Sequence, residues 1–272
     1  MSDFVKLETK NNVAVVTLNR PDKKNALTFN MLEKLSKIGR SLKLERNIIA
    51  VIIQSSSQTF CSGIDIKNFA VLAADKDFLN SVMVPVEGSK SNKMQDPCTI
   101  WQELDIPVIA VLEGSTFGAG LQLALGADIR IASRDTILSI METKWGLIPD
   151  MGITSVLPKL LSYDQALRLT LRADLINATE ALSLGLVTQC VENPHAEALK
   201  WVEKLSITSP DATRFTKKLY REAWLSANST NLKLEAYFQT KLVGTPNQME
   251  AVLSNFEKRS PQFQHTDYSN DR

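Results

Sequence analysis

The stretch VIAVLEGSTFGAGLQLALGADIRIA, residues 108–132, decides the fold. It begins with a run of five apolar residues, 108–112, and ends with a second predicted strand, 129–132. A glycine-rich turn and a helical segment, residues 120–126, lie between these two runs. A strand, a helix and a further strand in this order indicate a βαβ unit with parallel strand pairing.

The segments on either side extend this pattern. A β-hairpin is predicted for residues 4–8 and 13–18, a helix capped by Thr28 follows, and further strands are predicted at residues 48–53 and 138–140. Two short helices are expected within residues 164–185. Residues 70–97 are expected to be helical but interrupted by polar residues, and to form the least ordered part of the chain, a loop over a binding site. The fold class is therefore α/β, with a core over residues 1–198 and a helical region over residues 199–272.

Composition excludes several classes of function. The chain has 272 residues, of which 44% are hydrophobic and 22% charged, and its 31 basic and 30 acidic side chains nearly cancel. We therefore expect no nucleic-acid partner and no membrane partner. Three widely spaced cysteines and two histidines argue against a disulfide framework and against a metal site. No apolar run is long enough to span a bilayer and no targeting segment is evident, so a cytoplasmic location is expected.

Three motifs carry candidate chemistry. Residues 60–67 (FCSGIDIK) follow a predicted strand, and their small residues let backbone N–H groups approach a ligand; an ordinary turn explains this motif equally well. Residues 114–122 (GSTFGAGLQ) place free N–H donors at a helix start, which suits an oxyanion, although tight strand–helix packing also requires glycines there. The third glycine of a dinucleotide fingerprint is missing.

The third motif, residues 141–152 (METKWGLIPDMG), holds two carboxylates, Glu142 and Asp150. Glu142 stands among bulky apolar residues, so we expect its carboxyl group to be desolvated and its pKa raised, as a general base near neutral pH requires. The alternative is a capped turn with surface acids.

In their order and spacing these motifs resemble the crotonase superfamily, the enoyl-CoA hydratase/isomerase family. The resemblance rests on Asn19-Arg20-Pro21 with Asn25-Ala26-Leu27, and on the three motifs just described, and it runs from about residue 4 to the Phe256-Glu257-Lys258-Arg259 segment. It implies a ββα spiral fold, a C-terminal helical region for oligomerisation and coenzyme A contact, and a homotrimer or hexamer. It implies an acyl-CoA thioester substrate and no separate cofactor, because coenzyme A enters as part of the substrate.

The resemblance also implies roles for single residues. The backbone N–H groups of Ile64 and Ala119 correspond to the family's oxyanion hole, and Glu142 corresponds to its catalytic base. Residues for coenzyme A or substrate binding are implied at Lys24, Ala26, Ser62, Asp65, Ile66, Lys67 and Lys258. An aromatic residue is expected three positions before Lys258, where this chain has Asn255.

Departures from the family pattern bear on the reaction. Hydratases of the family carry a second glutamate where this chain has Gln122, and Asp150 stands where the dienoyl-CoA isomerase branch has its second catalytic carboxylate. We therefore favour double-bond isomerisation through a thioester enolate, with Glu142, Asp150 and Gln122 as the catalytic set. Hydration, with Gln122 holding the water, and a coenzyme A-binding protein without catalysis are the alternatives.

Overall fold

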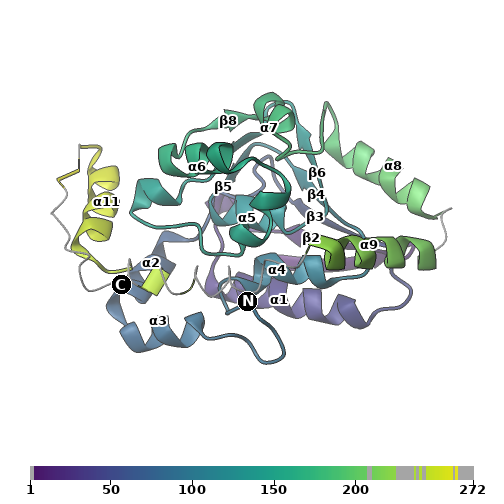
Figure 1. Cartoon of the computed structure of the whole chain (residues 1–272), viewed down its shortest axis with the longest axis horizontal. Coiled ribbons are helices and arrows are strands. Elements are labelled where there is room, and N and C mark those ends of the chain that lie inside the picture. Colours follow the sequence, from purple (N-terminus) through teal and green to yellow (C-terminus); the bar gives the residue numbers. More distant parts are fainter. Residues whose placement is uncertain are drawn as a thin grey trace.

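A six-stranded sheet forms the centre of the computed structural model, which describes residues 3–206, 210–224, 236, 239–240, 243–259 and 261–262. The strand order is β1-β2-β3-β4-β6-β9 (Figure 1). The β1–β2 hairpin is antiparallel, as predicted, and the four other pairings are parallel. The strands are β1 Val5–Lys10, β2 Val13–Leu18, β3 Ala50–Ser55, β4 Val108–Leu112, β6 Ile129–Ser133 and β9 Gln189–Val191.

A second, three-stranded sheet has the order β5-β7-β8, with strands β5 Ser115–Phe117, β7 Ile137–Ser139 and β8 Ile176–Asn177. The predicted βαβ unit is confirmed, since β4 and β6 pair in parallel on either side of α5, Ala119–Leu125. The α/β fold class is confirmed as well. The other helices that flank the sheets are α1 Phe29–Leu44, α2 Ile66–Ala74, α3 Lys76–Met83, α4 Asp96–Glu103, α6 Tyr163–Arg172, α7 Ala178–Leu184, α8 Pro194–Ser206, α9 Pro210–Trp224 and α11 Pro246–Glu257.

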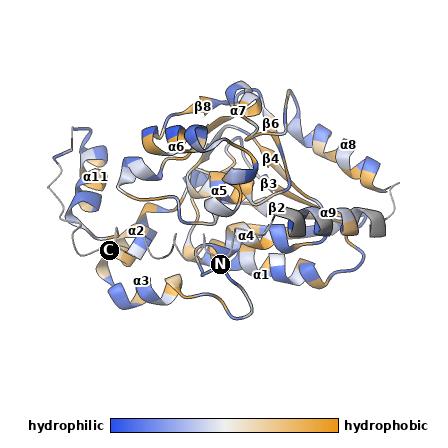
Figure 2. Ribbon diagram, in the orientation of Figure 1, coloured by the Kyte–Doolittle hydropathy of each residue, from blue (hydrophilic) through white to orange (hydrophobic). Residues whose placement is uncertain are grey.

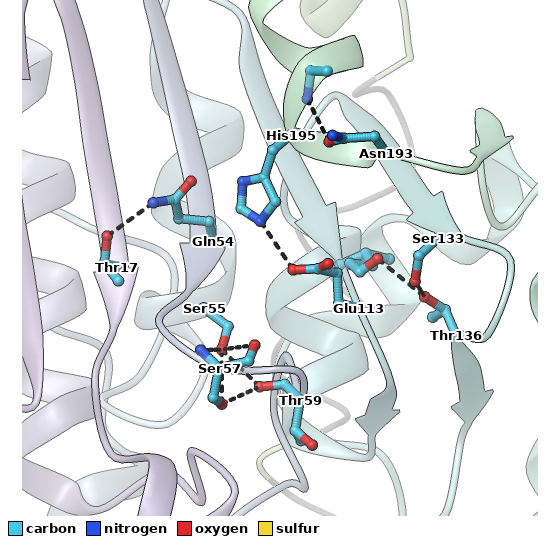
Figure 3. A network of polar contacts seen from close by, with 12 residues as sticks. Thr17, Gln54, Ser55, Ser57, Thr59, Glu113, Ser133, Thr136, Asn193 and His195 are labelled. Carbon is cyan, nitrogen blue, oxygen red and sulfur yellow. Dashed lines mark hydrogen bonds and ion pairs between the residues drawn. The ribbon is translucent and has the colours of Figure 1, made fainter.

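Apolar side chains cover both faces of the central sheet, whose strands are largely hydrophobic in Figure 2. On one face, Ala198, Trp201 and Val202 of α8 pack against the strands. The start of α8 is also tied to the end of β4, because His195 and Glu113 form a hydrogen bond of 2.9 Å between Nε2 and Oε2 (Figure 3). In the described part of the chain no helix is both long and apolar enough to cross a membrane.

The helical character expected for residues 70–97 is confirmed, since they form most of α2, all of α3 and a tight connection to the start of α4 in place of an open loop. The connection is packed, and its Asn92 side chain is 1% exposed. The Asn92 Oδ1 atom accepts hydrogen bonds from the N–H groups of Met94 and Gln95, each 2.9 Å long. Such local side chain to backbone bonds replace regular secondary structure and fix the path of the chain.

Helix α9 is attached by basic side chains that bind the carbonyl ends of two other helices. Arg214 donates to the carbonyl oxygens of Arg46 and Ile48, just after the end of α1. Lys217 donates to the carbonyl oxygens of Trp101 and Ile106, around the end of α4, and forms an ion pair of 2.6 Å with Asp128; Arg221 donates to Glu103 O. The last carbonyls of a helix lack partners within it and attract cations.

The C-terminal helix α11 packs on the short 3-10 helix η2, Glu142–Trp145. The Asn255 side chain donates to Lys144 O at 2.7 Å, and the rings of Trp145 and Phe256 lie 6.1 Å apart. Asn255, which departs from the family pattern, therefore helps to hold α11 on η2. The predicted division at residue 198 falls within α8; it remains a prediction, and part of the helical region lies outside the described residues.

Candidate active site

Two neighbouring segments carry Ile64 and Ala119, which line the same cavity. The segments are joined by a parallel bridge between Cys61 and Thr116. On its other side the loop pairs with Leu27, which donates to Gly63 O and accepts from Asp65 N, each at 2.8 Å. Partners of a parallel bridge alternate, so the N–H of Ile64 itself points away from Leu27. It has no hydrogen-bond acceptor among the described residues.

Ala119 is the first residue of α5, and its N–H likewise has no acceptor in the part of the chain that the structure describes. The turn before it is fixed by Gly118, which has φ +50° and donates to Ser139 O at 3.0 Å. A positive φ of this kind favours glycine. The N-terminus of a helix, with its unused donors, favours negative charge. Two residues with unused N–H groups, Ile64 and Ala119, therefore line the same cavity.

Gly120 allows α5 to lie directly on the first motif. A Cβ atom at Gly120 would come within 2.6 Å of Cys61 Cβ and 2.7 Å of Cys61 O. Gly120 is therefore required for tight strand–helix packing, and this requirement is compatible with a helix start that presents N–H donors to an oxyanion. Cys61 is completely buried, and burial raises the pKa of its thiol to about 12, so it is no nucleophile.

Glu142 is a half-buried residue whose carboxylate lines the site. Its Oε1 lies 3.3 Å from an ideal Cβ position on Gly118, which places it beside the Ala119 turn. Its Oε2 is buried and has no hydrogen-bond partner among the described residues. Desolvation raises the pKa of Glu142 to about 7, while a hydrogen bond from Gln122 opposes this change. The desolvated carboxylate expected from the sequence is thus present.

Both the nitrogen and the oxygen of the Gln122 side-chain amide form hydrogen bonds. Its Nε2 donates to Glu142 Oε1 at 2.7 Å, and its Oε1 accepts from Met151 N at 2.8 Å. The backbone N–H of Met151 can only donate, so the Gln122 side-chain oxygen must face Met151. The Gln122 NH₂ group must then face Glu142. Gln122 is 3% exposed and holds Glu142 with Oε2 as the oxygen left available.

Asp150 lies in the same cavity, which has a volume of about 710 Å³ and is lined by Ile64, Ala119, Gln122, Glu142 and Asp150 among others. The structure thus brings together all five residues expected to perform or support the chemistry. The Asp150 side chain is buried, with 6% exposure.

The residues expected to bind coenzyme A divide into two groups. Those that line the cavity are Ala26, Ser62, Asp65, Ile66 and Lys67. Lys24 and Lys258 do not line it; both have positive φ, and Lys258 is exposed at the C-terminal end of α11.

Two basic residues that the sequence analysis did not select, Arg20 and Lys23, line the cavity instead. Arg20 Nη1 forms an ion pair of 2.6 Å with Asp65 Oδ2, and Asp65 Oδ1 also caps α2 by accepting from Lys67 N. The Asp65 carboxylate is therefore occupied by contacts within the chain. The Asn19-Arg20-Pro21 motif contained the signal for Arg20, since an arginine beside a ligand loop is a common anion contact.

Further lining comes from the C-terminal region, through Gln239, Gln248, Met249, Val252 and Phe256. No sequence motif marks these residues, and those on α11 reach the cavity because α11 packs on η2. A Cβ atom at Gly146 would meet Gln248 Cα at 2.7 Å, so this glycine, which has φ +70°, permits the packing.

Two unused amides beside a desolvated carboxylate define a site that can stabilise an enolate oxyanion and move a proton. Comparisons with known proteins agree with this class. Residues 8–266 match the family model described as enoyl-CoA hydratase/isomerase, so the chain belongs to the enoyl-CoA hydratase/isomerase family.

Individual relatives span almost the whole chain. Bacillus subtilis YngF, which is named after the same family, is 32% identical over 265 residues, with 95% of this chain and 97% of that protein covered. Mouse mitochondrial methylglutaconyl-CoA hydratase is 28% identical, with coverage of 94% and 81%. The crystal structure of an enoyl-CoA hydratase/isomerase from Pseudoalteromonas atlantica superposes with a TM-score of 0.83 at 27% identity, with coverage of 96% and 100%. These relatives are consistent with the general reaction of the family and with acyl-CoA thioester substrates.

Proposed function

We propose that the chain isomerises the double bond of an enoyl-CoA through a thioester enolate. The observation that carries the proposal is the Glu142 carboxylate, with one oxygen held by Gln122, the other free of partners among the described residues, and a pKa of about 7. A base of this pKa removes a proton efficiently near neutral pH.

In the proposed reaction the thioester carbonyl oxygen accepts hydrogen bonds from the N–H groups of Ile64 and Ala119. Glu142 Oε2 takes a proton from C2 of a 3-enoyl thioester, and the electron pair of that C–H bond moves into a dienolate whose negative charge rests on the thioester oxygen. The dienolate then takes a proton at C4, either from protonated Glu142 or from protonated Asp150, to which Glu142 then passes its own proton. The double bond then lies between C2 and C3, and both carboxyl groups are back in their starting state. No atom is gained or lost.

Gln122 supports isomerisation over hydration because its amide is already bound. With Oε1 on Met151 N and one N–H on Glu142, it offers at most one remaining N–H to a water. It also cannot accept the proton that water must lose. In our proposal Gln122 is therefore a positioning residue for Glu142, and not the ligand of a catalytic water.

Hydration remains the second candidate, because several relatives carry hydratase names, among them the mouse, rat and human methylglutaconyl-CoA hydratases. Incubation with 2-enoyl-CoA and 3-enoyl-CoA substrates in D₂O separates the two. We expect deuterium in the acyl chain and a shifted double bond without hydration. Formation of a 3-hydroxyacyl-CoA would establish the hydratase, and the absence of both products would leave a coenzyme A-binding protein. Glu142→Gln should abolish exchange, whereas Glu113→Gln, outside the cavity, should not.

A homotrimer or hexamer is the assembly we propose, on the basis of family resemblance and of the exposed aromatic side chain of Phe215 on α9, which is 68% exposed. Light scattering at micromolar concentration should give three or six times the chain mass of 30.2 kDa. A monomer would contradict this assembly. A cytoplasmic location also remains a prediction.

A further inference from the structure

The N–H group of Ile64 lies at the end of a short chain of hydrogen-bonded peptide groups. Leu27 N donates to Gly63 O at 2.8 Å, and Gly63 O belongs to the same peptide group as Ile64 N. This peptide group is trans, and the C=O and N–H of a trans peptide point in opposite directions. The bond from Leu27 therefore fixes the direction in which the Ile64 N–H points.

Arg20 holds the other end of this chain. Its Nη1 donates to Ala26 O at 2.8 Å, and Ala26 O belongs to the same peptide group as Leu27 N. The guanidinium group thus binds the first peptide group, which binds the second, which ends in the Ile64 N–H. A positive charge at the head of such a chain polarises each peptide group in turn, so it strengthens the last N–H as a donor.

Further contacts fix the Arg20 side chain. Its Nη1 also forms an ion pair of 2.6 Å with Asp65 Oδ2, and the two side chains are 15% and 12% exposed. The Arg20 N–H donates to Asn25 Oδ1 at 2.7 Å, and the guanidinium carbon lies 5.5 Å from the centre of the Phe4 ring. Burial raises the pKa of Asp65, but hydrogen bonds from the Lys67 N–H and from Arg20 outweigh it and hold this pKa below its usual range. The carboxylate is therefore charged at neutral pH and retains the guanidinium group.

The unused amide of Ala119 is fixed in a different way. Its peptide carbonyl, Gly118 O, accepts from Gln122 N at 2.9 Å as part of helix α5. The helix itself therefore holds this donor. Of the two donors, the Ile64 amide is the one whose direction depends on a charged side chain far away in the sequence.

We propose that Arg20 is a positioning residue for the oxyanion amide of Ile64. It acts through the two peptide groups that lie between them, and it touches neither the thioester nor the reacting carbons. This inference rests on the proposed function in that the Ile64 N–H binds the thioester oxygen. Without the guanidinium group the Ala26 carbonyl loses this donor, and the Ile64 N–H is held less firmly and polarised less strongly. Oxyanion stabilisation depends on donors that are already in place before the charge develops.

Infrared spectroscopy of a bound thioester measures these hydrogen bonds without turnover. The probe is butyryl-CoA with an isotopic label at the thioester carbonyl carbon, bound to the full chain. Hydrogen bonds to a carbonyl oxygen lower its stretching frequency, so the band should lie lower on the wild-type protein than in water. In Arg20→Met the band should move back towards its position in water. Loss of a whole oxyanion donor costs about 10²–10³ in kcat, so a weakened donor should cost about tenfold, with KM changed by less than about threefold.

Matched variants separate this role from a general effect on the fold. Arg20→Lys should restore the band and bring kcat to within about threefold of wild type, because one nitrogen of Arg20 makes both contacts and an ammonium group can do the same. Arg20→Gln, which is neutral and shorter, should show the same loss as Arg20→Met and replaces it if that variant does not fold. Arg172→Met removes an ion pair of the same 2.6 Å length, with Asp174 and outside the cavity, and should match the wild type.

Unchanged carbonyl bands in Arg20→Met and Arg20→Gln would overturn the inference, and so would a loss in Arg20→Lys equal to theirs. A higher KM and weaker binding of free coenzyme A with an unchanged band would also overturn it, because Arg20 would then contact the coenzyme directly. A wild-type band no lower than in water would refute the oxyanion role of the Ile64 and Ala119 amides, and the proposed function would fall as well. The expected bands without any isomerase activity would refute only the proposed reaction.

Discussion

Replacing Glu142 by glutamine should change the stability of the protein in a way that depends on pH. The folded-state pKa of Glu142 is raised from 4.5 to about 7 by burial. Below pH 4.5 the carboxyl group is protonated in both the folded and unfolded states and contributes nothing to the pH dependence. Between pH 4.5 and 7 the unfolded chain loses the proton while the folded chain keeps it, so the free energy of unfolding falls as pH rises.

The size of this effect follows from the pKa change. Each tenfold change in proton affinity corresponds to about 1.4 kcal/mol, so a change from 4.5 to about 7 corresponds to about 3 kcal/mol above pH 7. Glutamine keeps the oxygen that accepts from Gln122 Nε2 and carries no charge. Glu142→Gln should therefore gain about 3 kcal/mol relative to wild type between pH 4 and pH 8.

Urea denaturation of both proteins at the same concentration and at pH 4, 6 and 8 measures this difference. Other titrating groups cancel in the comparison, because the two chains share them. The same variant should lose about 10²–10⁴ in proton-exchange rate at pH 8. A stability difference that is constant with pH would show that Glu142 is not desolvated, and the argument for it as the base would fall with it.

Three further substitutions test other parts of the site. Gln122→Met removes the hydrogen bond that stabilises the ionised carboxylate of Glu142, so the pH at which kcat/KM reaches half its maximum should move above 7. Gln122→Glu should make two carboxyl groups share a proton, which should move that pH still higher and raise the rate of hydration. An unchanged pH profile in both variants would contradict the positioning role of Gln122. Gly120→Ala places a Cβ 2.6 Å from Cys61 Cβ and should lower the unfolding free energy by about 1–3 kcal/mol in urea denaturation; a stability equal to wild type would refute the close-packing explanation. Ile64→Ala keeps the backbone N–H and should leave kcat within about threefold of wild type, so a loss of about 10² or more would mean that the side chain, and not the amide, carries the function.

Some of the site could be predicted from the sequence because its parts lie on short local motifs. The Ile64 and Ala119 amides depend on a loop and a helix start, and both depend on backbone geometry that glycine spacing reports. The environment of Glu142 was also predictable, since its apolar neighbours stand beside it in sequence. The predicted helix after Thr28 is confirmed, because Thr28 Oγ1 accepts from Met31 N at 3.3 Å.

Other features depend on contacts between distant segments, which no local pattern encodes. Gln122 and Glu142 are twenty positions apart, and only the fold shows that the amide binds the carboxylate and Met151 N at once. Residues 70–97 appear polar and interrupted in sequence. The polar residues Ser91, Asn92 and Gln95 are instead buried, and Asn92 and Gln95 are bonded to each other.

The attachment of α9 has a consequence for the order in which the chain folds. Arg214, Lys217 and Arg221 bind carbonyl groups at the ends of α1 and α4, and these clusters of acceptors exist only once those two helices have formed. Helix α9 therefore has no binding site on a chain in which α1 and α4 are still unfolded. We therefore expect α9 to dock late and to be released before the sheet opens, so that hydrogen exchange measures faster exchange for the amides of α9 than for those of β3 and β4.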